Sequence, residues 1–310
     1  MKRKIEWLDP ADAGAFLESG TNAFRIAWFA GGWVERFGRT VLISARSSED
    51  SDAACEGLQT WGALTGWMPD RVFRRWLVRD PGVNDTPELI LGDRGDGPCE
   101  TVSECGLFYG VDFSSGYSPG LFCDQRANRR YLRTRTPRHL LNTFSYTCAF
   151  SVAAAAAGAE TCSVDASKAF LQRGRRNFEM NGINPATHRF VTEDVPTYLS
   201  RLVRRGATFD AIILDPPTFG RGGGGKTFRA QRDFPSLVSA AAQLAAPGCA
   251  ILLSTNFAEW TCSQLEALAR PLLPAGTRFH REPNDPDFRL NCPSSTLWAL
   301  LPEETPNRTK

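Results

Sequence analysis

The run Asp215-Pro216-Pro217-Thr218-Phe219 is the segment of this sequence best suited to chemistry. It follows FDAIIL, an almost entirely apolar run typical of a strand buried on both faces. Consecutive prolines fix φ and remove two donors, so the chain leaves the sheet stiffly. The carbonyls and the Asp215 carboxylate can then accept hydrogen bonds from an amino group on a planar base, on which Phe219 or Phe228 can stack. A structural Pro-Pro turn is the alternative.

Acidic residues also follow two other predicted strands. Asp165 ends the run TCSVD, where its carboxylate can accept hydrogen bonds from both hydroxyls of a ribose. Asp194 follows the run HRFVT and Glu193, where it is placed to accept from an adenine amino group. A helix-start charge beside Ser167 and an exposed helix start are the respective alternatives. Together with residues 215–219, these acids predict a nucleoside pocket beside a group-transfer site.

A small polar turn, NTFSYTCA at residues 142–149, follows the first predicted strand of this region. The next predicted helix points its amino end at this turn, and free backbone N–H groups there favour a carboxylate or a phosphate. An ordinary loop explains the same residues. The chain contains no G-x-G-x-x-G, which argues against a standard dinucleotide fingerprint.

Strands alternate with helices from His139 onward, which implies parallel pairing with right-handed crossovers. The expected elements are strands at 140–144, 161–165, 188–192, 209–215, 249–255 and 294–301, and helices at 151–159, 167–181, 195–205, 231–246 and 262–273. We therefore expect an α/β fold with a doubly wound, seven-stranded, mostly parallel sheet over residues 111–310.

A smaller α+β domain is expected over residues 1–110, with substrate binding as its candidate role. The runs FRIAWF and TVLISA read as strands, and residues 53–64 read as a helix. Residues 80–98 are rich in Gly, Asp and Pro, which is typical of turns or an exposed connection.

Seven stretches, in this order, resemble the family of bacterial ribosomal RNA large-subunit methyltransferases, which includes the 23S rRNA cytosine-C5 and guanine-N7 enzymes. They are SPGLFCDQRANRRYL, LLNTFSYTCAFSVAAAAAGA, SVDASKAFLQRGRRNFEMNGI, HRFVTEDV, FDAIILDPPTF, FRAQRDF and APGCAILLSTN. The resemblance runs from about Ser118 to Asn256. It implies a class I methyltransferase fold, S-adenosyl-L-methionine as cofactor and an RNA substrate, 23S rRNA being favoured.

The resemblance also assigns roles to residues. It implies Asp165 on the ribose, Asp194 on the adenine, and the target base in the turn 215–218, with Asp215 near the cofactor as well. The other residues expected near the cofactor are Asp124, Gln125, Arg126, Phe144, Ser145, Tyr146, Thr147, Ala166, Ser167 and Val195. The chain departs from the family at Cys148 and Ala149, where glycines usually meet the methionine part of the cofactor.

The atom that is methylated depends on cysteine placement. Methylation of cytosine C5 needs a thiolate that adds to C6, and relatives with this chemistry place the cysteine just after the fifth strand. Here that segment, 253–256, has no cysteine, and Cys262 lies several residues later at a predicted helix start. A nitrogen carries its own lone pair and needs only positioning. The sequence therefore favours N-methylation of a base, guanine first, with Asn256 orienting it.

Basic residues give a local argument for RNA, although the formal net charge of +2 gives no global one. Six arginines fall between residues 126 and 138, among which Arg130 and Arg133 are candidate phosphate ligands. Lys226 and Arg229 lie on a glycine-rich loop at 220–229 that can act as a lid. A solvated helix face and a plain surface loop are the alternatives.

Composition excludes several classes of protein. The nine cysteines include no CxxC pair and there are three histidines, so no metal site is expected, and unpaired thiols are typical of a reducing cytoplasm. No apolar run suits a signal peptide or a membrane span. A homodimer stays open. The competing functions are a methyltransferase for a small molecule or a protein amide, and a non-catalytic RNA-binding protein that kept the fold.

Overall fold

A computed structural model describes residues 4–77, 86–93, 97, 99–217, 219–221, 227–257, 260–289 and 294–303, with backbone alone described at 219–221 and 227–230. The chain divides into two compact units. Unit 1 comprises residues 1–126 and 284–291, and unit 2 comprises residues 127–283 and 292–310. Residues 111–126 therefore belong to the first unit, whereas the sequence pattern predicts a domain boundary after residue 110. The substrate-binding role of residues 1–110 stays a prediction.

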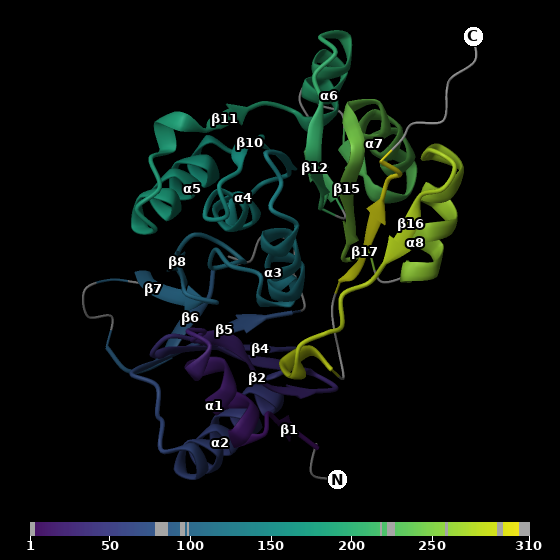
Figure 1. The fold of residues 1–310 in the computed structure, drawn as a ribbon. Coiled ribbons are helices and arrows are strands. Elements are labelled where there is room, and N and C mark those ends of the chain that lie inside the picture. The colour runs from purple at the N-terminus through teal and green to yellow at the C-terminus, as the bar shows by residue number, and fades with distance from the viewer. Residues whose placement is uncertain are drawn as a thin grey trace. The chain divides into compact units, whose positions relative to one another are not determined.

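Unit 1 contains a six-stranded sheet in the order β1-β2-β3-β4-β5-β6 and a separate hairpin, β7-β8 (Figure 1). Its elements are β1 (Glu6–Trp7), α1 (Pro10–Glu18), β2 (Ala23–Phe29), β3 (Gly32–Phe37), β4 (Thr40–Ala45), α2 (Ser48–Thr65), β5 (Arg71–Trp76), β6 (Glu88–Leu91), β7 (Cys99–Glu104), β8 (Leu107–Asp112), η1 (Cys123–Gln125) and η5 (Pro286–Phe288). Strands β4 and β5 pair in parallel, so α2 between them is a crossover.

Strand β3 was not predicted, because its sequence, GWVERF, carries two charged residues. The structure places partners beside Glu35. Trp33 Nε1 donates to Glu35 Oε2 at 3.0 Å, and Arg75 lies 3.6 Å from the same carboxylate. The helix predicted at 53–64 begins earlier, because Ser47 Oγ accepts from the backbone N–H of Asp50 and caps α2.

Arg126 is almost fully buried in unit 1 and is surrounded by acids. Its two terminal nitrogens each donate to one oxygen of Asp287 at 3.0 Å, and one of them also donates to the carbonyl of Ala23 at 2.9 Å. Its guanidinium lies 4.6 Å from the centre of the Phe16 ring. Burial alone would lower the pKa of Arg126, but Asp287 and Glu104 raise it above its ordinary value. This ion pair joins segments 161 residues apart in the chain.

Unit 2 is built on a seven-stranded sheet in the order β11-β10-β9-β12-β15-β17-β16. Its elements are α3 (Arg126–Arg135), β9 (His139–Thr143), α4 (Ala149–Ala155), β10 (Glu160–Asp165), α5 (Lys168–Met180), η2 (Pro185–Thr187), β11 (Arg189–Thr192), α6 (Val195–Arg204), β12 (Phe209–Leu214), β13 (Phe219–Arg221), β14 (Thr227–Arg229), α7 (Ala230–Leu244), β15 (Ala245–Thr255), α8 (Cys262–Ala269), η4 (Arg270–Leu272), β16 (Arg278–His280) and β17 (Ser295–Leu300). Strands β9, β10, β11, β12 and β15 pair in parallel, which confirms the predicted α/β sheet.

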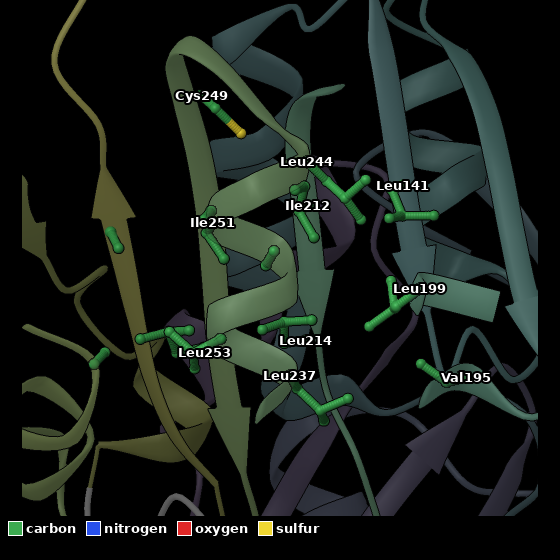
Figure 2. Close-up of a cluster of buried hydrophobic side chains, with 14 of the residues drawn as sticks. Leu141, Val195, Leu199, Ile212, Leu214, Leu237, Leu244, Cys249, Ile251 and Leu253 are labelled. Carbon is green, nitrogen blue, oxygen red and sulfur yellow. The ribbon is translucent and has the colours of Figure 1, made fainter. Parts of the chain in front are cut away.

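Both faces of this sheet are covered by helices. On one face, Ile212 and Leu214 of β12 pack with Leu237 of α7 and Leu199 of α6 (Figure 2). On the other face, Ala211 and Ile213 of the same strand belong to a second cluster, with residues of α3, α4 and β17. Successive strand residues point to opposite faces, so burial on both sides explains why β12 is apolar throughout.

The carboxyl-terminal edge strands differ from the predicted pattern. Strand β17 pairs antiparallel with β15 and with the short β16, which was not predicted. Helix α7 ends at Leu244 and β15 begins at once, so Pro247-Gly248 lies inside the strand instead of closing the helix. Gly248 adopts φ +74°, and its N–H donates to the carbonyl of Pro302 at 2.9 Å.

The buried ion pair of unit 1 yields a stability prediction. Asp287→Ala removes the main partner of Arg126 and leaves the buried guanidinium with two more distant carboxylates, Asp285 at 3.3 Å and Glu104 at 3.8 Å. We expect the free energy of unfolding to fall by about 3–5 kcal/mol, measured by urea denaturation of the full chain. Asp70→Ala is the control, because Asp70 and Arg39 form an ion pair with exposed side chains. Its unfolding curve should not move, and equal shifts in both variants would contradict the role given to Asp287.

Candidate functional site

The parallel strands of unit 2 end level with one another. Thr143 of β9 is paired with Val164 of β10 and with Leu214 of β12, and Leu214 is paired with Leu253 of β15. Thr192 of β11 is level with Asp165. The residues that follow these strands therefore share one edge of the sheet, which brings Asp165, Asp194 and Asp215 to the same side together with the turn after β9 and Asn256.

Strand order reverses at this edge. Strand β9 lies between β10 and β12, so the chain moves outward from β9 to β10 and β11 and then crosses to β12 on the other side. Turns that leave two neighbouring strands in opposite directions open a crevice beyond their carboxyl ends, and α/β proteins bind ligands there. The turn 144–148 and Asp215 flank this point.

Asp165 is held by two backbone donors. Its Oδ2 accepts from the N–H of Tyr146 at 2.9 Å, and its Oδ1 accepts from the N–H of Ser167 at 2.8 Å. Burial raises the pKa of Asp165, although these two hydrogen bonds oppose the rise. An ionised carboxylate has about four lone-pair sites, so each oxygen can accept one further donor. Two vicinal hydroxyls would satisfy both. Ala166, the neighbour on the chain, is exposed.

The turn after β9 has an unusual backbone. Phe144, Tyr146 and Cys148 adopt φ values of +52°, +49° and +62° without being glycines. Ser145 and Thr147 between them are buried, and the ring of Tyr146 meets Phe170 edge-on at 4.5 Å. Cys148 is the N-cap residue of α4 and supplies no side-chain capping bond. Strained conformations of this kind persist where the surroundings hold them, and they gather at functional sites.

Asp194 is the N-cap of α6. Its Oδ2 accepts from the N–H and the hydroxyl of Thr197 at 3.2 and 2.8 Å. Val195, which the resemblance placed near the cofactor, is 3% exposed and packs in the core, so any ligand contact would use its backbone. The adjacent Glu193 forms an ion pair with Arg201.

The Asp-Pro-Pro corner follows β12 directly. Asp215 is half-buried, Pro216 is buried and Pro217 is exposed. Thr218 and Lys226 lie outside the described residues. Phe219 and Arg229 are paired in the antiparallel β13–β14 ladder, and nothing is described of their side chains. The segment predicted as a lid thus contains a short β-ladder at its two ends.

Cys262 is turned toward the sheet. It is the first residue of α8, and its thiol lies 3.4 Å from the carbonyl oxygen of Thr296 on β17. The Cys262 thiol is thus engaged as a hydrogen-bond donor to β17. Asn256, by contrast, is exposed at the end of β15.

The arginine-rich segment splits into buried and exposed members. Arg126 is committed to the ion cluster of unit 1, and Arg129 is 3% exposed with its guanidinium 5.7 Å from the Phe150 ring. Arg130 is exposed and Arg133 is half-buried on α3. Asp124 and Gln125 also belong to unit 1, in η1. The cofactor roles expected for residues 124–126 stay predictions.

Helix α5 contributes two residues that sequence reasoning missed. Asn177 is 1% exposed, and its Nδ2 donates to the carbonyl of Thr147 at 2.9 Å. Gly174, one turn earlier, packs beneath Cys148. A glycine inside a helical pattern is the available signal, because it commonly marks a close approach of another segment.

Two absences in the described residues bear on cofactors and membranes. Among these residues, no group of three or more His, Cys, Asp or Glu side chains is arranged to hold a metal ion. In the same part of the chain, no helix is both long enough and apolar enough to cross a bilayer.

Comparisons with known proteins agree on one family. Residues 94–302 match the model of a family described as S-adenosylmethionine-dependent methyltransferase. YwbD of Bacillus subtilis (strain 168) is 39% identical over 172 residues, which cover 54% of this chain and 43% of YwbD. Ribosomal RNA large subunit methyltransferase K of Neisseria meningitidis serogroup B is 32% identical over 213 residues, covering 68% of this chain and 59% of that protein. The chain thus spans about half the length of these curated relatives.

A solved structure extends the likeness to nearly the whole chain. The crystal structure of SMU.776 complexed with SAH superposes with a TM-score of 0.75 at 25% identity, covering 96% of this chain and 83% of that one.

Asp165 yields a pH prediction. In a carbon-13 NMR titration of the ligand-free chain, we expect its carboxyl to titrate above the ordinary value of about 3.9. Asp70 is the internal comparison, because its hydrogen bond with Arg39 lowers its pKa. With a folded-state pKa above the unfolded one, the contribution of Asp165 to stability is complete at low pH and is lost as the pH rises through the folded-state pKa. If the pKa values of Asp165 and Asp70 were shifted in the same direction from the ordinary value, this prediction would be contradicted.

Proposed function

This chain belongs to the S-adenosylmethionine-dependent methyltransferase family, and we propose that it methylates a nitrogen of a base in RNA, with guanine in 23S ribosomal RNA the favoured target. The observation that carries the proposal is the convergence of Asp165, the strained turn 144–148 and Asp215 at one edge of the sheet, at its switch point. Its setting would be the cytoplasm.

The residues at this edge fit the cofactor. Asp165 keeps one acceptor site on each oxygen for the two ribose hydroxyls, and Asp194 is the candidate acceptor for the adenine amino group. Cys148 stands where the resemblance implies a glycine, but it is 0% exposed, and its thiol packs against Gly174 of α5. The larger side chain therefore takes no space from a ligand at the edge.

The chain's own part in the reaction is orientation. S-adenosylmethionine supplies a methyl group on a positively charged sulfur, ready for attack by a lone pair. Asp215 and the carbonyls of the Pro-Pro corner would accept from the amino group of the base and fix its plane. Asn256, exposed at the end of the neighbouring β15, would hold a second polar group of the base. Holding the reacting atoms about 3–3.5 Å apart and in line lowers the barrier without a covalent intermediate.

The positions and protonation of the cysteine thiols favour methylation of a nitrogen over methylation of carbon C5 of cytosine. Attack on C6 requires a thiolate at the base, whereas the Cys262 thiol donates to the carbonyl of Thr296 on β17. Burial raises the pKa of Cys148 to about 12, so this thiol stays protonated and is unsuited to nucleophilic attack.

An RNA substrate is supported by the name of the Neisseria relative, which specifies the RNA of the large ribosomal subunit. Arg130 and Arg133 offer cations on α3 for phosphate groups. Lys226 and Arg229, on the segment expected to act as a lid, would add to them. A homodimer is compatible with the proposal and is not required by it.

Methyl transfer tests the proposal directly. Tritium from labelled S-adenosylmethionine should enter bulk ribosomal RNA and not small metabolites or proteins. Nucleoside digestion should then release an N-methylated base. Asp215→Ala should lower kcat about 100-fold through misplacement of the base, whereas Cys262→Ala should retain full activity. Label in metabolites would favour the small-molecule reading. A denaturant-stable adduct with 5-fluorocytosine RNA that disappears in Cys262→Ala would establish C5 chemistry instead.

The RNA-binding role of α3 has a separate test. Arg130→Ala with Arg133→Ala should weaken RNA binding while the affinity for S-adenosylhomocysteine stays constant. The slope of log K against log salt should also fall by about one for each phosphate group that the variant no longer binds. Arg270→Ala is the control, because Arg270 is exposed and pairs with Glu266. An unchanged salt slope in the double variant would remove α3 from the RNA surface.

A further inference from the structure

The turn after β9 concentrates backbone strain. Of the five non-glycine residues with positive φ in the described chain, three are Phe144, Tyr146 and Cys148. An L-residue in the left-handed region costs roughly 1–2 kcal/mol, and glycine would remove that cost. The surroundings of the turn must therefore hold it in place.

Three sets of contacts hold the turn. Toward the sheet, the N–H of Ser145 donates to the carbonyl of Val164 at 3.0 Å, and the N–H of Tyr146 donates to Asp165. Within the turn, the N–H of Cys148 donates to the carbonyl of Ser145 at 2.7 Å. The third set comes from α5, whose Asn177 donates to the carbonyl of Thr147.

Helix α5 also carries a glycine where a helix would favour alanine. A Cβ at Gly174 would lie 2.4 Å from Cys148 Sγ, closer than a real Cβ atom approaches another atom, and 3.0 Å from Cys148 Cβ, which is tighter than most such contacts. Gly174 is buried and is not at positive φ, so neither turn geometry nor a cap explains it. A glycine inside a helix costs about 0.5–1 kcal/mol relative to alanine. The space it leaves is filled by the Cys148 thiol.

The thiol also meets polar groups beneath the turn. Its sulfur lies 3.8 Å from Ser145 Oγ and 3.8 Å from the carbonyl oxygen of Tyr146. Ser163 of β10, which also bonds the thiol, lies 2.8 Å from Ser151 of α4. The side chain at position 148 therefore connects the turn to β10, α4 and α5 at once.

We propose that Cys148 is a positioning residue for the cofactor: its thiol packs over Gly174 and so holds the turn in a left-handed form that only glycine adopts without strain. The inference rests on the proposed function, because the turn is taken as the seat of the methionine part of the cofactor. Residues 148 and 174 act as a matched pair, with side-chain volume on the turn and none on the helix. Moving that volume from the turn to the helix should preserve cofactor binding, and changing one member alone should not.

A double-mutant cycle tests the pair. The affinity for S-adenosylhomocysteine is measured by calorimetry, and thermal unfolding without ligand is measured beside it, for wild type, Cys148→Gly, Gly174→Ala and the combined variant. We expect Gly174→Ala to weaken binding at least 10-fold, because its methyl group displaces the thiol and the turn. Cys148→Gly should weaken it about 3-fold by leaving the space empty, and the combined variant should return to within 2-fold of wild type.

Cys249→Ala is the matched control. Cys249 is likewise 0% exposed, but it lies toward the amino-terminal end of β15, away from the carboxyl edge. The Cys249→Ala variant should have a lower thermal midpoint and an unchanged affinity for S-adenosylhomocysteine. If Gly174→Ala behaves like this control, or if the combined variant shows the summed loss of the two single changes, the pair is only structural and the inference fails. If wild type itself does not bind S-adenosylhomocysteine, the proposed function and this inference fall together.

Discussion

The register of the parallel strands is the constraint on which the site depends. Thr143, Val164, Leu214 and Leu253 stand level because the backbone ladder pairs them. Residues that follow them meet at one edge although they lie tens of positions apart in the sequence. The helix after β9 packs on one face of the sheet and α7, after β12, packs on the other, so the turns diverge. Backbone hydrogen bonds between the strands thus bring the side chains of the site to one edge of the sheet, without any need for contacts among those side chains.

Rigid support of the turn after β9 follows from this arrangement. Asp165 accepts hydrogen bonds from the backbone N–H groups of Tyr146 and Ser167, and the same carboxylate is the proposed acceptor for the ribose hydroxyls. Asn177 secures the turn from α5, about three helical turns beyond the capped start of that helix at Ser167. Support of this kind fixes a strained backbone before any ligand arrives, which reduces the ordering cost of binding.

Unit 1 uses charge in a different way. Its buried arginines are neutralised by neighbouring acids, with Arg126 beside Asp287 and Glu104, and Arg75 beside Glu35. Such clusters tolerate little change, because each charged group loses its hydration on folding and depends on the opposite charges around it for compensation. Unit 1 is not continuous in sequence, because it comprises residues 1–126 and 284–291. The ion pair between Arg126 and Asp287 links these two segments.

The sequence by itself determined the alternating strands and helices of unit 2, the helix start at Ser167, and the position of Asp165, Asp194 and Asp215 after successive strands. These features are local, since side-chain periodicity and capping act within a few residues. It did not reveal β3, whose Glu35 lies beside Arg75 and Trp33, or the edge strand β16. Nor could it say that Cys148 fits over Gly174, or that Arg126 belongs to an ion pair with a residue 161 positions away. Only the tertiary structure decided these points, because burial, steric fit and charge compensation depend on which distant segments are brought together.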